Sequence, residues 1–109
     1  MTVKELTNIS DFRAVSLPNP QRDISGAYAS DLISWVMGRA KEGDAWLTIM
    51  SNINVIAVAT LSDVSCVILT EGVTLDKTVL DTATEKGVNI ISTLLTTYEA
   101  SIKLAEALG

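Results

Sequence analysis

The sequence predicts an α/β domain of three layers, in which helices cover both faces of a mainly parallel sheet of about four to five strands. From Asp23 onward, extended segments alternate with helical ones, and this alternation is typical of βαβ units around a parallel sheet. The segment "VSCVILT" (64–70) is apolar almost throughout. Such a run fits a central parallel strand, because helices cover both faces of that strand.

The first 23 residues are expected to form an N-terminal piece that precedes the alternating core of residues 24–109. "VKELTNI" (3–9) indicates a short helix, and "FRAVSL" (12–17) indicates a strand. "SLPNPQRDISG" (16–26) is rich in proline and glycine and predicts a loop. With 109 residues, of which 48% are hydrophobic, the chain is expected to form one domain around one sizeable core.

In the core, extended segments and helix starts follow one another in order. The predicted strands are "DISGAYA" (23–29), "AWLTIM" (45–50), "CVILT" (66–70) and "NIISTL" (89–94). The predicted helices begin near Asp31, Ile53, Asp76 and Thr97. Helix N-caps are expected at Asp31, Asn52, Asp76 and Thr96, and Thr96 with Glu99 matches a capping box.

The predicted helices differ in how their apolar residues are distributed. Leu32, Ile33, Val36, Met37 and Ala40 gather on one face of the first core helix, and Trp35 lies outside that face. "INVIAVATL" (53–61) is apolar on every side and is therefore expected to be buried nearly all round. In the last helix, a stripe is expected to face the core; it comprises Tyr98, Ile102, Ala105 and Leu108.

Composition argues against several classes of function. The net charge is −5 with no basic run, which disfavours nucleic acids and anionic membrane surfaces as partners. The chain has no histidine and a single cysteine, Cys66, so a disulfide within the chain and Ser/His or Cys/His catalysis are excluded. We expect no metal and no cofactor. No apolar run approaches the length of a membrane span and the N-terminus has no signal-peptide core, so we expect a cytoplasmic protein.

Polar residues are expected at the carboxyl ends of the strands, where open parallel sheets bind ligands. The residues in question are Tyr28, Ser30, Asp31, Ser51, Asn52, Thr70, Glu71, Gly72, Ser92 and Thr93. Backbone N–H groups at helix starts and side-chain hydroxyls suit a small anion. The alternative is that these residues only cap helices. Asp31 and Glu71 would form an acid/base pair only if they faced each other across a cleft, so we assign no catalytic residue.

A second candidate surface is apolar. It comprises Trp35, Ile53, Ile56, Ala59 and Thr60. Large aromatic residues are enriched at interface centres, and exposed apolar surface marks an interface. We therefore expect a homodimer through this surface. The alternative is that the N-terminal segment of the same chain covers it.

Several ordered blocks of the sequence resemble the DRTGG domain family. They are "GAYASDLISWVMGRAKEGDAWLTI", "NINVIAVA", "VILTEG" and "GVNIISTLLTTYEASIKLAEAL", and the resemblance runs from about Ile24 to the C-terminus. The family is similar to the N-terminal domain of HPr kinase/phosphatase. Its members occur alone in anaerobic bacteria, beside CBS modules and within phosphate acetyltransferases. This chain departs from the family pattern in two places, with Glu71 where a first glycine is expected and Trp35 where an acidic residue is expected.

The resemblance implies a three-layer α/β fold with a regulatory or interaction role. Together with the apolar surface, it predicts a small non-enzymatic domain that acts as a homodimer. The alternative is a ligand-sensing module that binds a small anionic or nucleotide-like metabolite at the strand ends. The expected partners are therefore a second copy of the chain, another protein or a small anionic metabolite.

Overall fold

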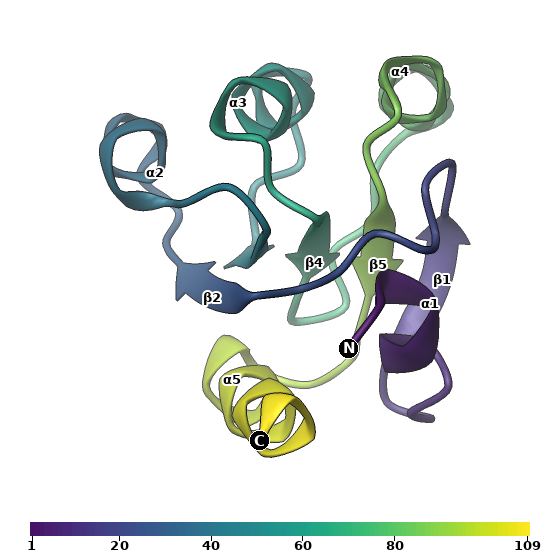
Figure 1. Cartoon of the computed structure of the whole chain (residues 1–109). Coiled ribbons are helices and arrows are strands. Elements are labelled where there is room, and N and C mark those ends of the chain that lie inside the picture. Colours follow the sequence, from purple (N-terminus) through teal and green to yellow (C-terminus); the bar gives the residue numbers. More distant parts are fainter.

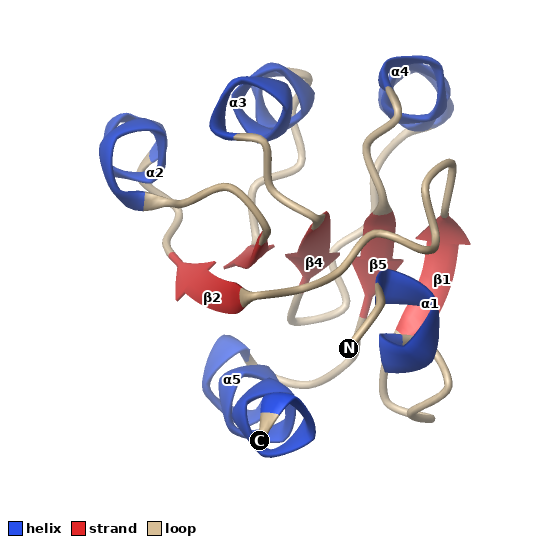
Figure 2. Cartoon of the chain, viewed as in Figure 1, coloured by secondary structure: helices blue, strands red, loops and turns tan.

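Figure 1 shows the computed structural model of the chain, which describes residues 1–109. The N-terminal part contains α1 (Val3–Leu6) and β1 (Arg13–Ser16). The alternating core then runs through β2 (Gly26–Ala29), α2 (Ile33–Arg39), β3 (Asp44–Thr48), α3 (Asn54–Ser62), β4 (Cys66–Leu69), α4 (Lys77–Lys86), β5 (Ile90–Ser92) and α5 (Thr97–Leu108). Helices α2, α3 and α4 lie on one side of the sheet, and α5 and α1 lie on the other (Figure 2). The predicted three-layer α/β class is confirmed.

The sheet has five strands in the order β1-β5-β4-β3-β2. Strands β2, β3, β4 and β5 are parallel, and β1 is antiparallel to β5. Each parallel step passes through one helix, as a crossover connection requires. The four carboxyl ends of the parallel strands therefore lie along one edge of the sheet, which we call the carboxyl edge.

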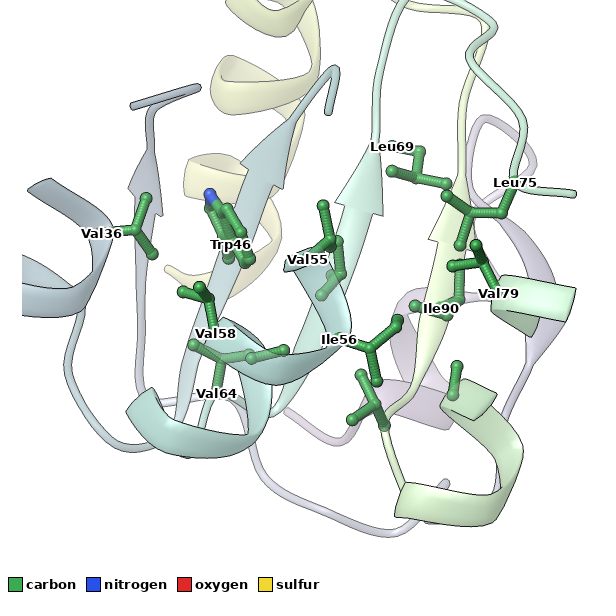
Figure 3. Packing of buried hydrophobic residues seen from close by; sticks show 14 residues of the cluster. Val36, Trp46, Val55, Ile56, Val58, Val64, Leu69, Leu75, Val79 and Ile90 are labelled. Carbon is green, nitrogen blue, oxygen red and sulfur yellow. The ribbon is translucent and has the colours of Figure 1, made fainter. Parts of the chain in front are cut away.

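Strands β3 and β4 are buried on both faces. In β3, Trp46 faces α2, α3 and α4, whereas Ala45 and Leu47 belong to the cluster on the α5 side. This alternation follows from the two-residue period of a strand. Figure 3 shows Trp46 among Val36, Val55 and Val58. Trp46 is fully buried.

The N-terminal segment completes the core cluster on the α5 side of the sheet. Val3, Leu6 and Phe12 are buried together with Ala100 and Leu104 of α5. The loop that follows β1 is held by Asn89, whose side-chain amide donates to the carbonyl oxygens of Asn19 and Ser65 at 2.7 and 2.9 Å. Its Oδ1 accepts from the Asn19 N–H at 2.9 Å, so this buried amide is fully used.

Two predicted helix faces are wrong. In α5, Tyr98, Ile102 and Ala105 are exposed, and the core-facing residues are Ala100 and Leu104. In α3, one side is exposed, with Leu61 at 73%. A single sheet can cover only one side of a helix, so a helix that is apolar on every side leaves some apolar residues exposed to water.

No helix is both long and apolar enough to span a bilayer.

Candidate functional site

At the carboxyl ends of β2 and β3, the predicted polar residues are held in hydrogen bonds within the chain. The Asp31 carboxylate accepts from Thr48 Oγ1 at 2.8 Å and from the Ile49 N–H at 2.9 Å. Ser30 Oγ accepts from the Leu32 N–H at 3.1 Å. Asp31 is not the N-cap of α2, which begins after Leu32 without a side-chain cap, so that prediction is wrong. Asp31 instead ties the end of β2 to the end of β3.

The other predicted residues in this half of the edge lie apart from one another. Helix α3 has its N-cap at Ile53 and no side-chain cap, so the predicted N-cap at Asn52 is wrong. Asn52 Oδ1 instead accepts from the Asn54 N–H at 2.9 Å. Ser51 is exposed. Tyr28 is half-buried and packs against the core under α2, α3 and α4. None of these residues lines either of the two cavities described below.

At the carboxyl ends of β4 and β5, several predicted residues hold the start of α5. The hydroxyls of Thr70 and Thr97 are 2.6 Å apart, and Thr93 Oγ1 accepts from the Leu95 N–H at 3.1 Å. The Glu71 N–H donates to the Leu95 carbonyl at 2.8 Å, and its carboxylate accepts from the Thr97 N–H at 3.4 Å. The predicted caps at Asp76 and Thr96 are confirmed, the latter as a complete capping box. Asp31 and Glu71 thus bond to different elements.

Beside these residues lies a cavity of about 230 Å³. Antiparallel pairing places Arg13 of β1 opposite Ser92 of β5, and the loop after β4 passes close by. Gly72 has φ 73°, and its N–H donates to the Thr93 carbonyl at 3.0 Å, which turns this loop back toward β5. The cavity is lined by Ser10, Asp11, Arg13, Gly72, Val73, Thr74, Ser92, Thr93, Leu94 and Leu95. We call it the Arg13 cavity.

A second cavity of about 360 Å³ adjoins the first, because both are lined by Arg13, Val73, Thr74 and Ser92. Its remaining walls are apolar and come from β1, β4, α4 and the loop before α4. They are formed by Ala14, Val15, Leu69, Leu75 and Leu80. Arg13 therefore stands between a polar hollow and an apolar one.

The positive charge of Arg13 at this site is unpaired. Arg13 is exposed and takes no part in the three ion pairs of the chain. Asp11, on the rim of the cavity, pairs with Lys103 at 3.1 Å. The Arg13 guanidinium is thus free to bind an anion with its planar set of N–H donors.

Of the predicted strand-end residues, the structure brings Gly72, Ser92 and Thr93 to this cavity. Sequence reasoning missed Arg13, Thr74 and Ser10, which also line it. "FRAVSL" was a recognisable strand, but no local pattern shows that it pairs with β5. That pairing is what brings Arg13 to the carboxyl edge.

The single thiol carries no chemistry in the folded chain. Cys66 is buried in β4, and burial raises the pKa of its thiol to about 12. It therefore stays protonated and inert at neutral pH. Histidine is absent from the sequence, and no group of three acidic or cysteine side chains lies close enough to hold a metal ion.

The predicted apolar surface is divided between core and solvent. Ile56 and Ala59 are each only 2% exposed and pack in the core, so they cannot form part of a surface of this folded chain. Trp35 is 48% exposed, and Ile53 and Thr60 are exposed as well. The Arg39 guanidinium lies 3.7 Å from the centroid of the Trp35 ring, in a cation–π contact.

The five-stranded sheet, covered by helices on both faces, defines a small three-layer α/β domain. The sequence model of the DRTGG domain family matches residues 29–107, and the chain belongs to that family. Among solved structures, the fold is similar to the CBS and DRTGG domains of the regulatory region of Clostridium perfringens pyrophosphatase, solved with its activator diadenosine tetraphosphate. The TM-score is 0.72 at 17% identity over 93% of this chain, which spans 44% of the pyrophosphatase chain. The search of curated proteins found no significant match.

Proposed function

We propose that this chain, as a single DRTGG unit over residues 1–109, is a non-catalytic regulatory module that senses a small anionic metabolite in the Arg13 cavity. The observation that carries the proposal is an unpaired arginine in a cavity rich in hydroxyl groups. Arginine binds phosphate and carboxylate groups through two parallel N–H bonds. Ser10, Thr74 and Ser92 supply further donors around the same space.

The shape of the site favours a ligand with a polar end and an apolar end. The Arg13 cavity alone is smaller than the about 300–1,000 Å³ of typical ligand pockets, but the adjoining apolar cavity extends it. A phosphate beside Arg13 and a ring against Leu75 and Leu80 would use both parts. A nucleotide-like metabolite has this arrangement.

The predicted strand-end residues have unequal roles in this proposal. Gly72, Ser92 and Thr93 contact the ligand directly. Thr70 and Glu71 position the loop and the start of α5 next to it. Ser30, Asp31 and Asn52 support the other half of the edge through their internal bonds, and neither Tyr28 nor Ser51 is assigned to the ligand.

The similarity to a pyrophosphatase regulatory region supports a regulatory role, because that region was solved with a nucleotide activator. The absence of histidine and the inert thiol are consistent with a module that does no chemistry. A ligand bound by such a module would act through another domain or protein.

The test is a calorimetric titration of the wild-type chain with a panel of adenine nucleotides and acetyl phosphate. We expect at least one ligand to bind, and Arg13→Ala to weaken it by about tenfold or more, because a charge-assisted hydrogen bond contributes about 1.5–3 kcal/mol. Lys41→Ala is the matched control, because it removes one exposed positive charge away from the cavity. If no ligand binds, or if both variants bind equally well, the proposal is wrong.

Self-association is a second candidate function, favoured by the exposed apolar side chains of α2 and α3. Leu32 and Trp35 lie on α2 or at its N-cap, and Ile53 lies at the N-cap of α3; all three are about half exposed. Such side chains are common at the centres of interfaces. We propose a homodimer in which Trp35 is buried between the subunits.

The mass in solution tests this candidate. Light scattering after size exclusion is expected to give twice the chain mass of 11.6 kDa for the wild type, and a lower mass for Trp35→Glu. A charge in a buried interface is costly, so the substitution should favour the monomer. A wild-type monomer at micromolar concentrations would refute the homodimer.

A further inference from the structure

The two edge strands of the sheet differ in how they are protected. Strand β1 carries the charged Arg13 and has a shift of register between Ala14 and Ser16, and both features discourage pairing with another strand. Strand β2, "GAYA", has no charge and no proline, and it pairs with β3 in regular register along its whole length. Only the β2 edge is therefore suited to accept a further strand.

The backbone of β2 offers unused hydrogen-bonding groups at this edge. The Ser30 N–H donates to the Leu47 carbonyl at 3.2 Å, and Ala29 is the register partner of Leu47. In a parallel ladder this pattern directs the N–H and C=O of Tyr28 toward β3. Those of Ala27 and Ala29 consequently point away from the sheet, and both residues are exposed.

On one face of the sheet, helix geometry directs Trp35 toward the side of the molecule that carries the β2 edge. Val36 is the buried residue of α2, and Trp35 is about 100° around the helix from it. Ile33 lies on the other side of Val36 and packs against the core. Because α2 is the outermost helix of its row (Figure 1) and its core-packed side faces α3, Trp35 is directed toward the β2 edge.

On the opposite face, α5 contacts both β2 and β3. Its Lys103 reaches Asp11, which lies just before β1 at the other end of the sheet. Tyr98 is about 140° around the helix from Lys103 and is 76% exposed. It therefore faces the β2 side, so large apolar side chains border the β2 edge on both faces of the sheet.

We infer that β2 pairs antiparallel with β2 of a second copy of this chain, about a two-fold axis through Tyr28. Ala27 then lies opposite Ala29 of the partner subunit, and each such pair exchanges two backbone hydrogen bonds. The inference rests on the homodimer candidate and specifies its geometry. The two sheets become one continuous sheet that crosses the dimer.

A second copy fits this edge for three reasons. Because β2 carries no charge, two copies of it can pair without placing like charges opposite each other. The small alanine side chains also let the two strands approach closely. The two-fold axis also brings the same faces together, so the Trp35 side of one subunit meets the Trp35 side of the other. This isologous arrangement buries the apolar borders on both faces at once.

The test combines mass measurement with amide hydrogen exchange. Ala27→Pro removes an outward N–H while leaving the bonds of Tyr28 to β3, and proline is tolerated at such edge positions. We expect the wild type at twice 11.6 kDa and Ala27→Pro at 11.6 kDa. Thr60→Glu is the control, because it places a charge on the exposed side of α3 and should leave the dimer intact.

Amide hydrogen exchange of the wild-type chain tests the β2 pairing even if the Ala27→Pro variant misfolds. We expect the amides of Ala27 and Ala29 to become protected as the protein concentration rises, and that of Ala14 to stay unchanged. A dimer that Thr60→Glu splits, without protection at Ala27 and Ala29, would overturn the β2 pairing but keep the homodimer. A wild-type chain that stays monomeric would overturn both.

Discussion

Glu71 adopts a backbone conformation that normally belongs to glycine. Its φ is 61°, in the left-handed region, and the following Gly72 has φ 73°. Two consecutive residues of this kind let the loop after β4 turn back to bond with Thr93 and Leu95. The double glycine expected at this point in the DRTGG family thus has a physical explanation. Glu71 keeps the turn at the expense of backbone strain, and its carboxylate gains a long bond to the N–H of Thr97.

The effect of a substitution at Glu71 on the free energy of unfolding should depend on how well the new residue tolerates the left-handed backbone conformation, and not on the loss of the negative charge. Glu71→Gly and Glu71→Asn are expected to change the free energy of unfolding by less than about 1 kcal/mol, because both residues accept the left-handed region. Glu71→Val should lower it by about 2 kcal/mol, since a β-branched residue is strained there. Urea denaturation measures these differences. Equal stability of the valine and glycine variants would contradict this account of the turn.

Single residues were predictable where one local interaction decides their role. Thr96 and Asp76 are caps because the N–H groups they satisfy are three residues away. Asp31 was misassigned, because an aspartate near a helix start can also bond across to the next strand, as it does to Thr48. Arg13 was missed because its role depends on a partner strand more than seventy residues away in sequence.

At the scale of elements, the strands and helices of the core were predicted, and the faces of two helices were not. In α5, the helical period predicted that Tyr98, Ile102, Ala105 and Leu108 face the core. The sheet, however, packs against Ala100 and Leu104, and leaves Tyr98 and Ile102 outside. Apolar periodicity identifies an amphipathic helix, but it cannot tell which part of the apolar arc packs against the core and which part stays exposed.

In helix α3, which has no polar side, the sequence likewise does not show which apolar residues pack in the core. Its sequence indicated burial on all sides, and one sheet plus two neighbouring helices bury only Val55, Ile56, Val58 and Ala59. The exposed remainder includes Leu61 and Ala57. In α2, likewise, the exposed position of Trp35 was predictable from the wheel, but its contact with Arg39 was not.

For the molecule as a whole, the parallel order of the core strands was predictable from their alternation with helices. The position of β1 was not, because antiparallel pairing of an N-terminal strand leaves no local signature. This strand supplies Arg13 and lines both cavities of the proposed binding site. The proposed site therefore depends on the longest-range strand pairing in the sheet.

The central claim is that ligand binding occurs at the β4–β5 half of the carboxyl edge, beside Arg13. A ¹H–¹⁵N NMR titration of the wild-type chain with an adenine nucleotide tests it most directly. We expect concentration-dependent shifts of the amides of Gly72, Val73, Thr74 and Ser92, with little change at Ser51 and Asn52. Shifts centred on Ser51 and Asn52, with the amides around Arg13 unmoved, would contradict it.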